Sequence, residues 1–348
     1  MTINKHDTVR AIEWKNDRLY LLDQRLLPDT RKELEYTDVA SVATAITDMV
    51  VRGAPAIGIT AAFGVVIAAR RRYQQSTTDW KELIEEDLSM LAASRPTAIN
   101  LFWAIERMRE LINAIDADPV SILLNEAKRI HDEDIAANYR MGELALGLIQ
   151  DHSSVLTHCN AGSLATGGYG TALGVIRACW TAGKLDSVYA DETRPWLQGS
   201  RLTAWELLQD QIPVTLIAEG AASMLMQQRM ISWIIVGSDR IAANGDVANK
   251  IGTYNLAISA RYHGVKFMVV APTSTIAMQT PTGKDIPIEF RDADELLSLS
   301  GQPVAASGAE AWNPVFDVTP ASLVDVIVTE KGLIQAPDEA KIHALMRA

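Results

Sequence analysis

Two residues of this sequence combine acid–base chemistry with a position directly after a predicted strand. Cys159 follows the apolar run at residues 155–157, and Asp239 follows the apolar run at residues 233–237. A thiolate tuned by nearby donors can act as a base, and a carboxyl group whose pKa is raised by burial can donate a proton at neutral pH. Because parallel strands end at the same edge of a sheet, both side chains are candidates for one active site.

Each of these residues also has an ordinary structural explanation. Free cysteine is among the most buried residue types, so a core role for Cys159 is about an even alternative, and its strand-end position favours function. Cys179 lies in an apolar helical run and is assigned to the core. Asp239 taken alone would more often cap a helix or pair with Arg240. His158 is predicted to be a hydrogen-bonded buried histidine rather than a catalyst.

The segment after Cys159 is crowded with glycine and hydroxyl residues and leads into an apolar-periodic helix. Its glycines are Gly162, Gly167, Gly168 and Gly170. Glycine lets the backbone approach a ligand closely, and the free N–H groups at the start of the following helix favour an anion such as phosphate. A dinucleotide fingerprint is not predicted, because the third glycine falls at Gly174, one position too late for GxGxxG.

After residue 150, short apolar runs alternate with segments long enough to form helices. The runs that read as strands are residues 155–157, 187–190, 214–217, 233–237, 267–270 and 324–328. Strands separated by helices imply right-handed crossovers and a mostly parallel, doubly wound sheet. Residues 151–348 are therefore predicted to form a Rossmann-like α/β domain, with the ligand site in the loops that follow the strands.

Residues 1–150 read as a mostly helical domain with a small β-hairpin. Residues 9–14 and 18–22 alternate as strands around a polar turn. A helix is predicted from the N-cap residues Thr37 and Asp38 toward Pro55, followed by a strongly apolar helix over residues 57–70. Further helices are predicted around residues 100–108 and over about residues 120–149.

The composition excludes several classes of protein. The chain has 348 residues, 48% of them hydrophobic and 22% charged, enough for a large core and two domains. A net charge of −11 and a pI near 5.1 argue against binding to nucleic acid or to an anionic membrane. No apolar run is expected to approach the about 20 residues of a membrane span. The polar start over residues 1–10 does not resemble a signal peptide, so a cytoplasmic location is predicted.

Local cations are nonetheless available for an anionic ligand. Arg52, Arg95 and Lys250 are the basic candidates, although arginine on a protein surface is usually solvated or salt-bridged. Two cysteines are too few for a disulfide framework, and the chain shows no convincing His or Cys spacing for a metal. We therefore predict a small anionic substrate with no metal and no cofactor.

Several segments, taken in order along nearly the whole chain, resemble one enzyme family. They are Arg52-Gly53-Ala54-Pro55-Ala56-Ile57-Gly58, the loop of Cys159, Asp191-Glu192-Thr193-Arg194-Pro195 with Gln198-Gly199-Ser200-Arg201-Leu202-Thr203-Ala204, Val236-Gly237-Ser238-Asp239-Arg240-Ile241, Asn249-Lys250-Ile251-Gly252-Thr253, and Asn313-Pro314 with Phe316-Asp317-Val318-Thr319-Pro320. Together they resemble the methylthioribose-1-phosphate isomerases of methionine salvage. The resemblance implies interconversion of an aldose, 5-methylthioribose 1-phosphate, and a ketose, 5-methylthioribulose 1-phosphate.

The resemblance also implies roles for single residues. It makes Cys159 and Asp239 catalytic. It assigns substrate contacts to Arg52, Gly53, Ala54, Arg95, Gln198, Asn249 and Lys250. It implies a homodimer, which the long apolar region at residues 57–69 also favours. Two positions depart from the family pattern, Ala277 and Phe290, where acidic residues are common, and both are expected to affect how a late loop packs over the site.

Relatives of this family supply rival functions. The family is also similar to ribose-1,5-bisphosphate isomerase and to the regulatory subunits of the eukaryotic initiation-factor guanine-nucleotide exchanger. The rivals are therefore isomerisation of ribose 1,5-bisphosphate or 5-deoxyribose 1-phosphate, and a non-catalytic subunit that senses a nucleotide or sugar phosphate. A second phosphate would need another basic cluster, which the sequence does not reveal. A regulatory subunit would have no need of both Cys159 and Asp239.

The implied reaction suits the two candidate catalysts. A sugar whose anomeric oxygen carries phosphate cannot open to a free aldehyde in the ordinary way. Isomerisation then needs one group that protonates the ring oxygen and another that handles the hydrogen or hydroxyl at C2. Asp239, if protonated, suits the first task, and the thiol or thiolate of Cys159 suits the second.

Overall fold

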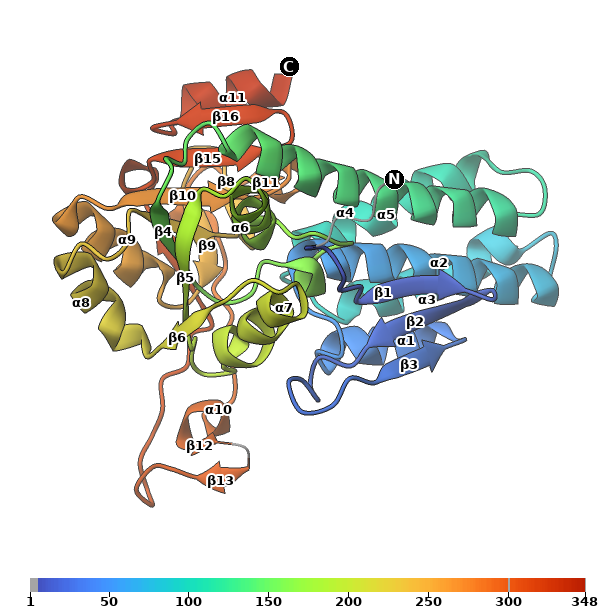
Figure 1. Ribbon diagram of the computed structural model, residues 1–348. Coiled ribbons are helices and arrows are strands. Elements are labelled where there is room, and N and C mark those ends of the chain that lie inside the picture. Colours follow the sequence, from blue (N-terminus) through green and yellow to red (C-terminus); the bar gives the residue numbers. More distant parts are fainter. Residues whose placement is uncertain (1–5, 300, 348) are drawn as a thin grey trace.

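In the computed structural model, which describes residues 6–299 and 301–347, a mostly helical N-terminal part lies beside a large α/β part (Figure 1). The predicted fold class is confirmed, since the α/β part contains a seven-stranded sheet that is mostly parallel. The domain boundary at residue 150 stays a prediction. The prediction for residues 1–10 falls partly on residues 1–5, which lie outside the described residues.

The chain begins with a small antiparallel sheet. Its strands are β1 (Ile12–Lys15), β2 (Arg18–Leu22) and β3 (Glu33–Tyr36). The predicted hairpin corresponds to β1 and β2, and β3 adds to its edge in the order β1-β2-β3. We did not predict β3, because its four residues include two exposed glutamates, which weaken the apolar alternation.

Helices form the rest of the N-terminal part. They are α1 (Val39–Thr47), α2 (Ala54–Gln75), α3 (Trp80–Ala93), α4 (Ile99–Ala114) and α5 (Val120–Ala145). Asp38 caps α1 as predicted, because its carboxylate accepts the backbone N–H of Ser41 at 2.8 Å. Pro55 lies in the first turn of α2, where its missing N–H costs nothing, so it begins this helix. We had not predicted α3 as a separate element.

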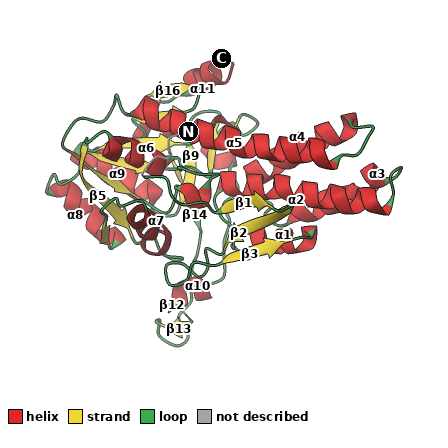
Figure 2. Ribbon diagram, turned by 45° about the vertical axis from the view of Figure 1, so that its right-hand side comes forward, coloured by secondary structure: helices red, strands yellow, loops and turns green. Residues whose placement is uncertain are grey.

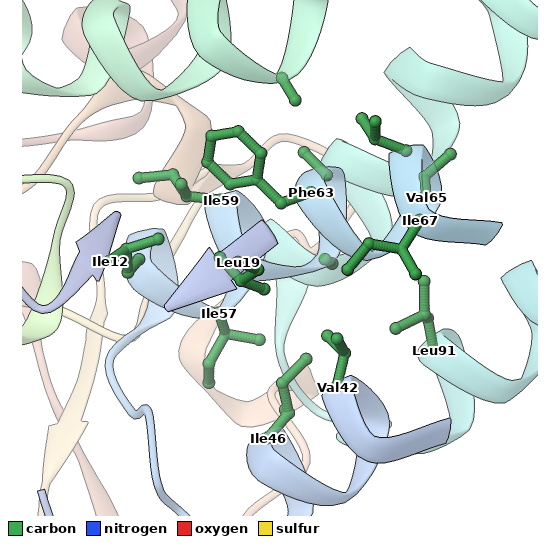
Figure 3. Close-up of a cluster of buried hydrophobic side chains, with 14 of the residues drawn as sticks. Ile12, Leu19, Val42, Ile46, Ile57, Ile59, Phe63, Val65, Ile67 and Leu91 are labelled. Carbon is green, nitrogen blue, oxygen red and sulfur yellow. The ribbon is translucent and has the colours of Figure 1, made fainter. Parts of the chain in front are cut away.

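Helix α2 is the centre of the N-terminal core. Every residue from Ile57 to Ala69 is buried, and Figure 3 shows Ile57, Ile59 and Phe63 among the surrounding apolar side chains. By length and composition this helix would pass as a membrane span, so our expectation that no apolar run approaches that length was wrong. However, 83% of its most apolar window is buried inside the protein, as in the core helix of a folded domain.

The large sheet organises the α/β part. Its strands are β4 (Ser153–Thr157), β5 (Leu185–Asp191), β6 (Thr215–Ile217), β7 (Trp233–Val236), β10 (Lys266–Val270), β15 (Val326–Thr329) and β16 (Gly332–Gln335). Their order is β16-β15-β10-β7-β4-β5-β6, and only the unpredicted β16 pairs antiparallel. The chain therefore winds in one direction from β4 to β6 and in the other from β7 to β15, which places the topological switch point between β4 and β7.

Helices cover both faces of this sheet (Figures 1 and 2). They are α6 (Ala172–Thr181), α7 (Ala204–Gln209), α8 (Ala222–Gln227), α9 (Thr253–His263) and α11 (Glu339–Arg347). Residues of α6 and α7 pack in one apolar cluster with the sheet, and residues of α8, α9 and α11 pack in another. The central strands β4, β7, β10 and β15 are mostly buried, which explains their nearly continuous apolar runs.

Short strands that we did not predict form a second sheet next to the first. They are β8 (Arg240–Ala242), β9 (Val247–Lys250), β11 (Ile276–Ala277) and β14 (Phe316–Thr319), in the order β11-β8-β9-β14. A short arm contains α10 (Asp294–Leu297), β12 (Ser298–Leu299) and β13 (Gln302–Pro303), and it projects from the body in both ribbon views. The small sheet matters for the site, because β9 ends with Asn249 and Lys250.

Candidate active site

The two proposed catalytic residues come together at the switch point of the large sheet. Cys159 follows the end of β4 by two residues, and Asp239 follows the end of β7 by three. Strands β4 and β7 are parallel neighbours, so both loops leave the same edge. Cys159, Asp239, Arg52 and Asn249 line one cavity, which we call the Cys159 cavity. Open α/β sheets bind ligands in such crevices.

The backbone at Cys159 is held in an unusual conformation. Its φ angle is +59°, a left-handed value that residues other than glycine adopt infrequently and that costs free energy. Two hydroxyl groups hold it there: the N–H of Cys159 donates to Thr193 Oγ1 at 2.9 Å, and its carbonyl accepts from Thr203 Oγ1 at 2.5 Å. Cys159 is 6% exposed, and its thiol lies beside the guanidinium of Arg52, with 3.9 Å between Sγ and Nη2.

Arg52 reaches this cavity from the helical part. Its Nη1 donates to the carbonyl and the side-chain oxygen of Asn160, at 2.9 and 3.0 Å. The amide of Asn160 donates in turn to Thr203 Oγ1 at 3.2 Å and to Glu206 at 3.1 Å. Glu206 also accepts the N–H of Ser163 in the glycine-rich loop. Arg52 is therefore oriented before any substrate arrives.

The next two residues place the start of α2 at the same cavity. Gly53 has φ +97°, and a Cβ there would lie 2.6 Å from the carbonyl oxygen of Ala165, so this close approach requires glycine. Gly53 and Ala54 line the Cys159 cavity, and α2 extends 22 residues behind them. The first N–H groups of a helix have no intrahelical acceptor and carry partial positive charge, which suits an anionic substrate group.

A second cavity adjoins the first and contains the remaining predicted contacts. We call it the Lys250 cavity, because Arg95, Gln198 and Lys250 line it together with Arg52 and Asp239. It shares Gly53 and Ala54 with the Cys159 cavity as well. All nine residues predicted for the site therefore line one or both of these adjoining cavities. Their individual roles stay predictions.

Lys250 is a buried cation. It is 4% exposed, its Nζ donates to the carbonyl of Val315 at 2.9 Å, and it lies 4.5 Å from the ring centroid of Phe316. Burial lowers the pKa of Lys250 to about 8, and the nearby charges of Cys159 and Asp239 offset part of that effect. Burial also lowers the pKa of Arg95, and the charge of neighbouring Arg291 adds to it.

Gln198 presents an unused acceptor to the site. The side chain is 5% exposed, and among the described residues its Oε1 has no hydrogen-bond partner. A buried carbonyl oxygen without a donor is unfavourable, so a substrate hydroxyl would satisfy it. Asn249, in the Cys159 cavity, donates from Nδ2 to Thr253 Oγ1 at 3.0 Å, which fixes the orientation of its amide.

Sequence reasoning missed several residues that line the Lys250 cavity. They are Gln24, Met49, Trp196, Arg201, Arg240, Ile286, Pro287, Ile288, Arg291 and Phe316, among others. Their segments are far apart in sequence, and the short strands and loops that carry them have weak local patterns. Of the two departures from the family pattern, Ala277 pairs within the small sheet, and the exposed Phe290 packs against Trp312. Neither lines a cavity described above, although residues 286–288 just before Phe290 do.

Two structural assignments from the sequence are confirmed. Cys179 is fully buried, and burial raises the pKa of its thiol to about 12. His158 is buried and uses both ring nitrogens in hydrogen bonds. As for metals, within residues 6–299 and 301–347 no group of three His, Cys, Asp or Glu side chains is arranged to hold an ion. Independence from metals and cofactors stays a prediction.

Known proteins with similar sequences align with almost the whole chain. The chain is 62% identical over 341 residues to the methylthioribose-1-phosphate isomerase of Thioalkalivibrio sulfidiphilus, covering 98% of each. It is 58% identical to the methylthioribose-1-phosphate isomerase of Alkalilimnicola ehrlichii, covering 98% of this chain and 99% of that one. Both alignments span nearly the whole chain.

Solved structures give the same result. The crystal structure of 5-methylthioribose 1-phosphate isomerase from Pyrococcus horikoshii OT3 superposes with a TM-score of 0.93 at 43% identity, covering 100% of this chain and 98% of that one. A structure named translation initiation factor eIF-2B, subunit delta, from A. fulgidus has a TM-score of 0.88 at 40% identity, covering 98% and 100%. Residues 50–336 match the family described as the Initiation factor 2 subunit family. This match includes the whole lining of the Cys159 cavity, that of the Lys250 cavity apart from Gln24 and Met49, and most of the chain, and the protein belongs to that family.

Proposed function

We propose that this protein is an isomerase that converts 5-methylthioribose 1-phosphate to 5-methylthioribulose 1-phosphate in methionine salvage. The observation that carries the proposal is that Cys159 and Asp239 line one cavity with Arg52. Full-length relatives at 62% and 58% identity bear the name of this enzyme. The wider class, a sugar-phosphate substrate, agrees with the basic lining of an otherwise acidic protein.

The geometry supports a division of labour in the reaction. Asp239 protonates the ring oxygen as the bond between that oxygen and C1 breaks, and Cys159 assists transfer of one hydrogen from C2 to C1. The proton that the C2 hydroxyl loses as it becomes the carbonyl restores the acid at Asp239. The aldose and the ketose are isomers, so no external oxidant or reductant is consumed. Arg52, the start of α2, Arg95 and Lys250 bind the phosphate and hydroxyl groups. Such contacts hold the reacting carbons near the two catalytic side chains.

The substituent at C5 discriminates among the candidate substrates. Of three further cations that line the Lys250 cavity, Arg291 is paired with the carboxylate of Glu289. The other two donate to backbone carbonyls, Arg201 to Gln24 and Arg25 and Arg240 to Thr97, so part of their donors is already used. Apolar side chains such as Met49, Trp196 and Phe316 share the cavity wall. This lining favours an uncharged methylthio group over a second phosphate.

The regulatory alternative has one specific point in its favour, the resemblance to a structure named as an initiation-factor subunit at 40% identity. A subunit that only senses a sugar phosphate needs the binding residues. It has no use for the thiol of Cys159 beside Arg52 or for the carboxylate of Asp239. Retention of both Cys159 and Asp239 in one cavity therefore favours turnover.

A substrate panel followed by NMR tests the proposal. The purified protein is incubated with 5-methylthioribose 1-phosphate, 5-deoxyribose 1-phosphate and ribose 1,5-bisphosphate. We expect the highest kcat/KM for the methylthio sugar and formation of the ketose signal. Preference for the bisphosphate would reassign the substrate, and binding without turnover of any of the three would support the regulatory alternative.

We also propose that the protein is a homodimer and works in the cytoplasm. The dimer rests on the family resemblance alone, because the apolar stretch at residues 57–69, which seemed too long for one domain to cover, is buried in the core of the same chain. The cytoplasmic location rests on the phosphorylated metabolite proposed as substrate. Light scattering at micromolar concentration tests the dimer, and a monomeric mass would contradict it.

A further inference from the structure

The imidazole of His158, directly before Cys159, makes two hydrogen bonds in a fully buried position. Its Nε2 lies 2.9 Å from the carbonyl oxygen of Ile251, and its Nδ1 lies 3.1 Å from Oδ2 of Asp191. A carbonyl oxygen only accepts hydrogen bonds, so Nε2 must carry a hydrogen. Another proton then lies between Nδ1 and the carboxylate, and the pair is neutral overall whichever atom holds it.

The surroundings explain why this pair has to be neutral as a unit. Both side chains are 0% exposed, and Glu219 and Asp317 add further carboxylates nearby. Burial alone would lower the pKa of His158, but the hydrogen bond to Asp191 and the charges of Asp191 and Glu219 raise it overall. Within the described chain, Oδ1 of Asp191 has no hydrogen-bond partner, so His158 is the contact that compensates this carboxylate.

The acceptor on the other side of the ring belongs to the segment that carries two substrate contacts. Ile251 and Gly252 form the turn after Asn249 and Lys250. Gly252 has φ +103°, and a Cβ there would lie 2.9 Å from Cε1 of His158, so the turn packs directly against the ring. Asp317 accepts the N–H of Gly252 at 2.8 Å and fixes the turn from the opposite side.

His158 therefore joins the catalytic loop to the binding strand. Cys159 follows it in the chain, and the N–H of Cys159 is bonded to Thr193, whose hydroxyl donates to the carbonyl of Asp191 at 3.1 Å. Asp191 ends β5, so the ring connects the ends of β4 and β5 with the turn after β9.

We propose that His158 is a positioning residue of the isomerase: the bond from its Nε2 to the carbonyl of Ile251 sets the position of Asn249 and Lys250 relative to Cys159. It does not act as the acid or base, since both ring nitrogens are engaged by protein groups. This inference rests on the proposed function for its kinetic test. His158 also lines the Cys159 cavity, but because both ring nitrogens are bonded to protein groups it contributes through the turn that it holds.

Two near-isosteric substitutions separate the two bonds. In His158→Asn, the amide takes the place of Nδ1 and keeps the contact with Asp191, but it cannot reach Ile251. In His158→Gln, the amide takes the place of Nε2 and keeps the contact with Ile251, but it leaves Asp191 unpaired. We expect KM for 5-methylthioribose 1-phosphate to rise about tenfold in His158→Asn, with kcat changed less than about threefold. We expect His158→Gln to melt at lower temperature with a KM near that of wild type.

Controls separate positioning from general destabilisation. Ile342→Ala removes a fully buried side chain of α11, and it should lower the melting temperature without changing KM. Gly252→Ala keeps the imidazole but would place a Cβ 2.9 Å from Cε1 of His158, so it forces the turn away from the ring. It should raise KM as His158→Asn does, which keeps the test informative if the asparagine variant fails to fold. A wild-type KM in folded His158→Asn or Gly252→Ala would overturn the inference, and so would a KM that simply follows the melting temperature across all variants.

A readout without substrate separates this inference from the proposed function. Alkylation of Cys159 by iodoacetamide, followed by mass spectrometry, reports the position of the catalytic loop, and the fully buried Cys179 serves as an internal reference. We expect faster alkylation of Cys159 in His158→Asn than in wild type or Ile342→Ala. If wild type fails to turn over the sugar phosphate, the proposed function fails. Independently of turnover, an unchanged alkylation rate of Cys159 in folded His158→Asn would contradict the positioning role.

Discussion

Arg52 and Asn160, 108 residues apart in the chain, are joined by two hydrogen bonds, one to the carbonyl and one to the side-chain oxygen of Asn160. They connect the helical part to the loop of Cys159 at the point where the substrate is proposed to bind. The remaining donors of Arg52 face the cavity beside the thiol. This pairing makes the arginine a preorganised contact, and it leads to the first prediction.

Arg52→Lys should weaken substrate binding although the charge is kept. A lysine ammonium cannot donate to both oxygens of Asn160 and still present a flat pair of donors to a phosphate. Charge-assisted hydrogen bonds contribute on the order of 1.5–3 kcal/mol, so we expect KM to rise about tenfold or more with a smaller change in kcat. Calorimetry with a substrate analogue measures the affinity directly, and wild-type affinity would remove Arg52 from the site.

Cys159→Ser and Asp239→Asn should abolish most of the turnover while leaving binding and folding intact. General acid–base groups contribute about 10²–10⁴-fold, so we expect a loss of that order in kcat for each variant. The combined loss should be smaller than the product if both residues act in one step. Single-turnover rates and thermal melts of each variant together distinguish a catalytic role from a structural one. A lowered melting temperature with near-normal kcat in Asp239→Asn would indicate a structural carboxylate.

Substrate affinity should fall as pH rises through about 8. Burial lowers the pKa of Lys250 to about 8, so its cation, which attracts the phosphate, is lost above that value. A phosphate monoester becomes a dianion above pH of about 6, so kcat/KM should be highest between the two values. Lys250→Met should lower kcat/KM and remove the alkaline limb. If kcat/KM of this variant still falls at alkaline pH, another titrating group is responsible.

The same lysine should make stability increase with alkaline pH. Its pKa is about 8 in the folded protein and 10.5 as a free side chain, so the unfolded chain binds more protons between these values. The free energy of unfolding should therefore rise from pH 8 to 10.5, by about 3 kcal/mol from this residue alone. Below pH 8 the full cost of the buried charge remains. Comparison of urea melts of wild type and Lys250→Met across this range isolates the contribution.

Trp196→Ala should reduce the preference for the methylthio group. Trp196 lines the Lys250 cavity, and its indole Nε1 donates to Glu295 at 2.9 Å, which links the cavity wall to the projecting arm. Loss of the apolar surface should lower kcat/KM for 5-methylthioribose 1-phosphate by about tenfold, as expected for roughly one buried methylthio group. The value for 5-deoxyribose 1-phosphate should change less. Trp196→Phe, which keeps an aromatic ring, is the control, and equal losses for both substrates would place the C5 substituent elsewhere.

Exhaustive chelation should leave activity unchanged. The proposed chemistry uses Cys159 and Asp239 directly, and charge on the substrate is met by arginine, lysine and the start of α2. Dialysis against EDTA followed by assay in metal-free buffer, with metal content measured by mass spectrometry, checks this prediction. Loss of activity that zinc or magnesium restores would overturn it.

Local patterns in the sequence determined the large elements of this protein. The apolar runs before Cys159 and Asp239 became β4 and β7, and the apolar stretch at residues 57–69 became the core of α2. Motifs resembling one family also supplied nine site residues, and all nine line one or both cavities beside others that the sequence did not reveal. A buried parallel strand or core helix has a composition that reports its own burial, so such elements can be recognised without knowing their neighbours.

Contacts between remote segments were decided only by the tertiary structure. The small sheet that carries Asn249 and Lys250 depends on pairing of β9 with β14, whose residues are more than sixty positions further along the chain. The low pKa of Lys250 and the neutral pairing of His158 with Asp191 depend on burial by several elements at once. Short strands and buried charges take their free energy from partners distant in sequence, and a local pattern contains no record of those partners.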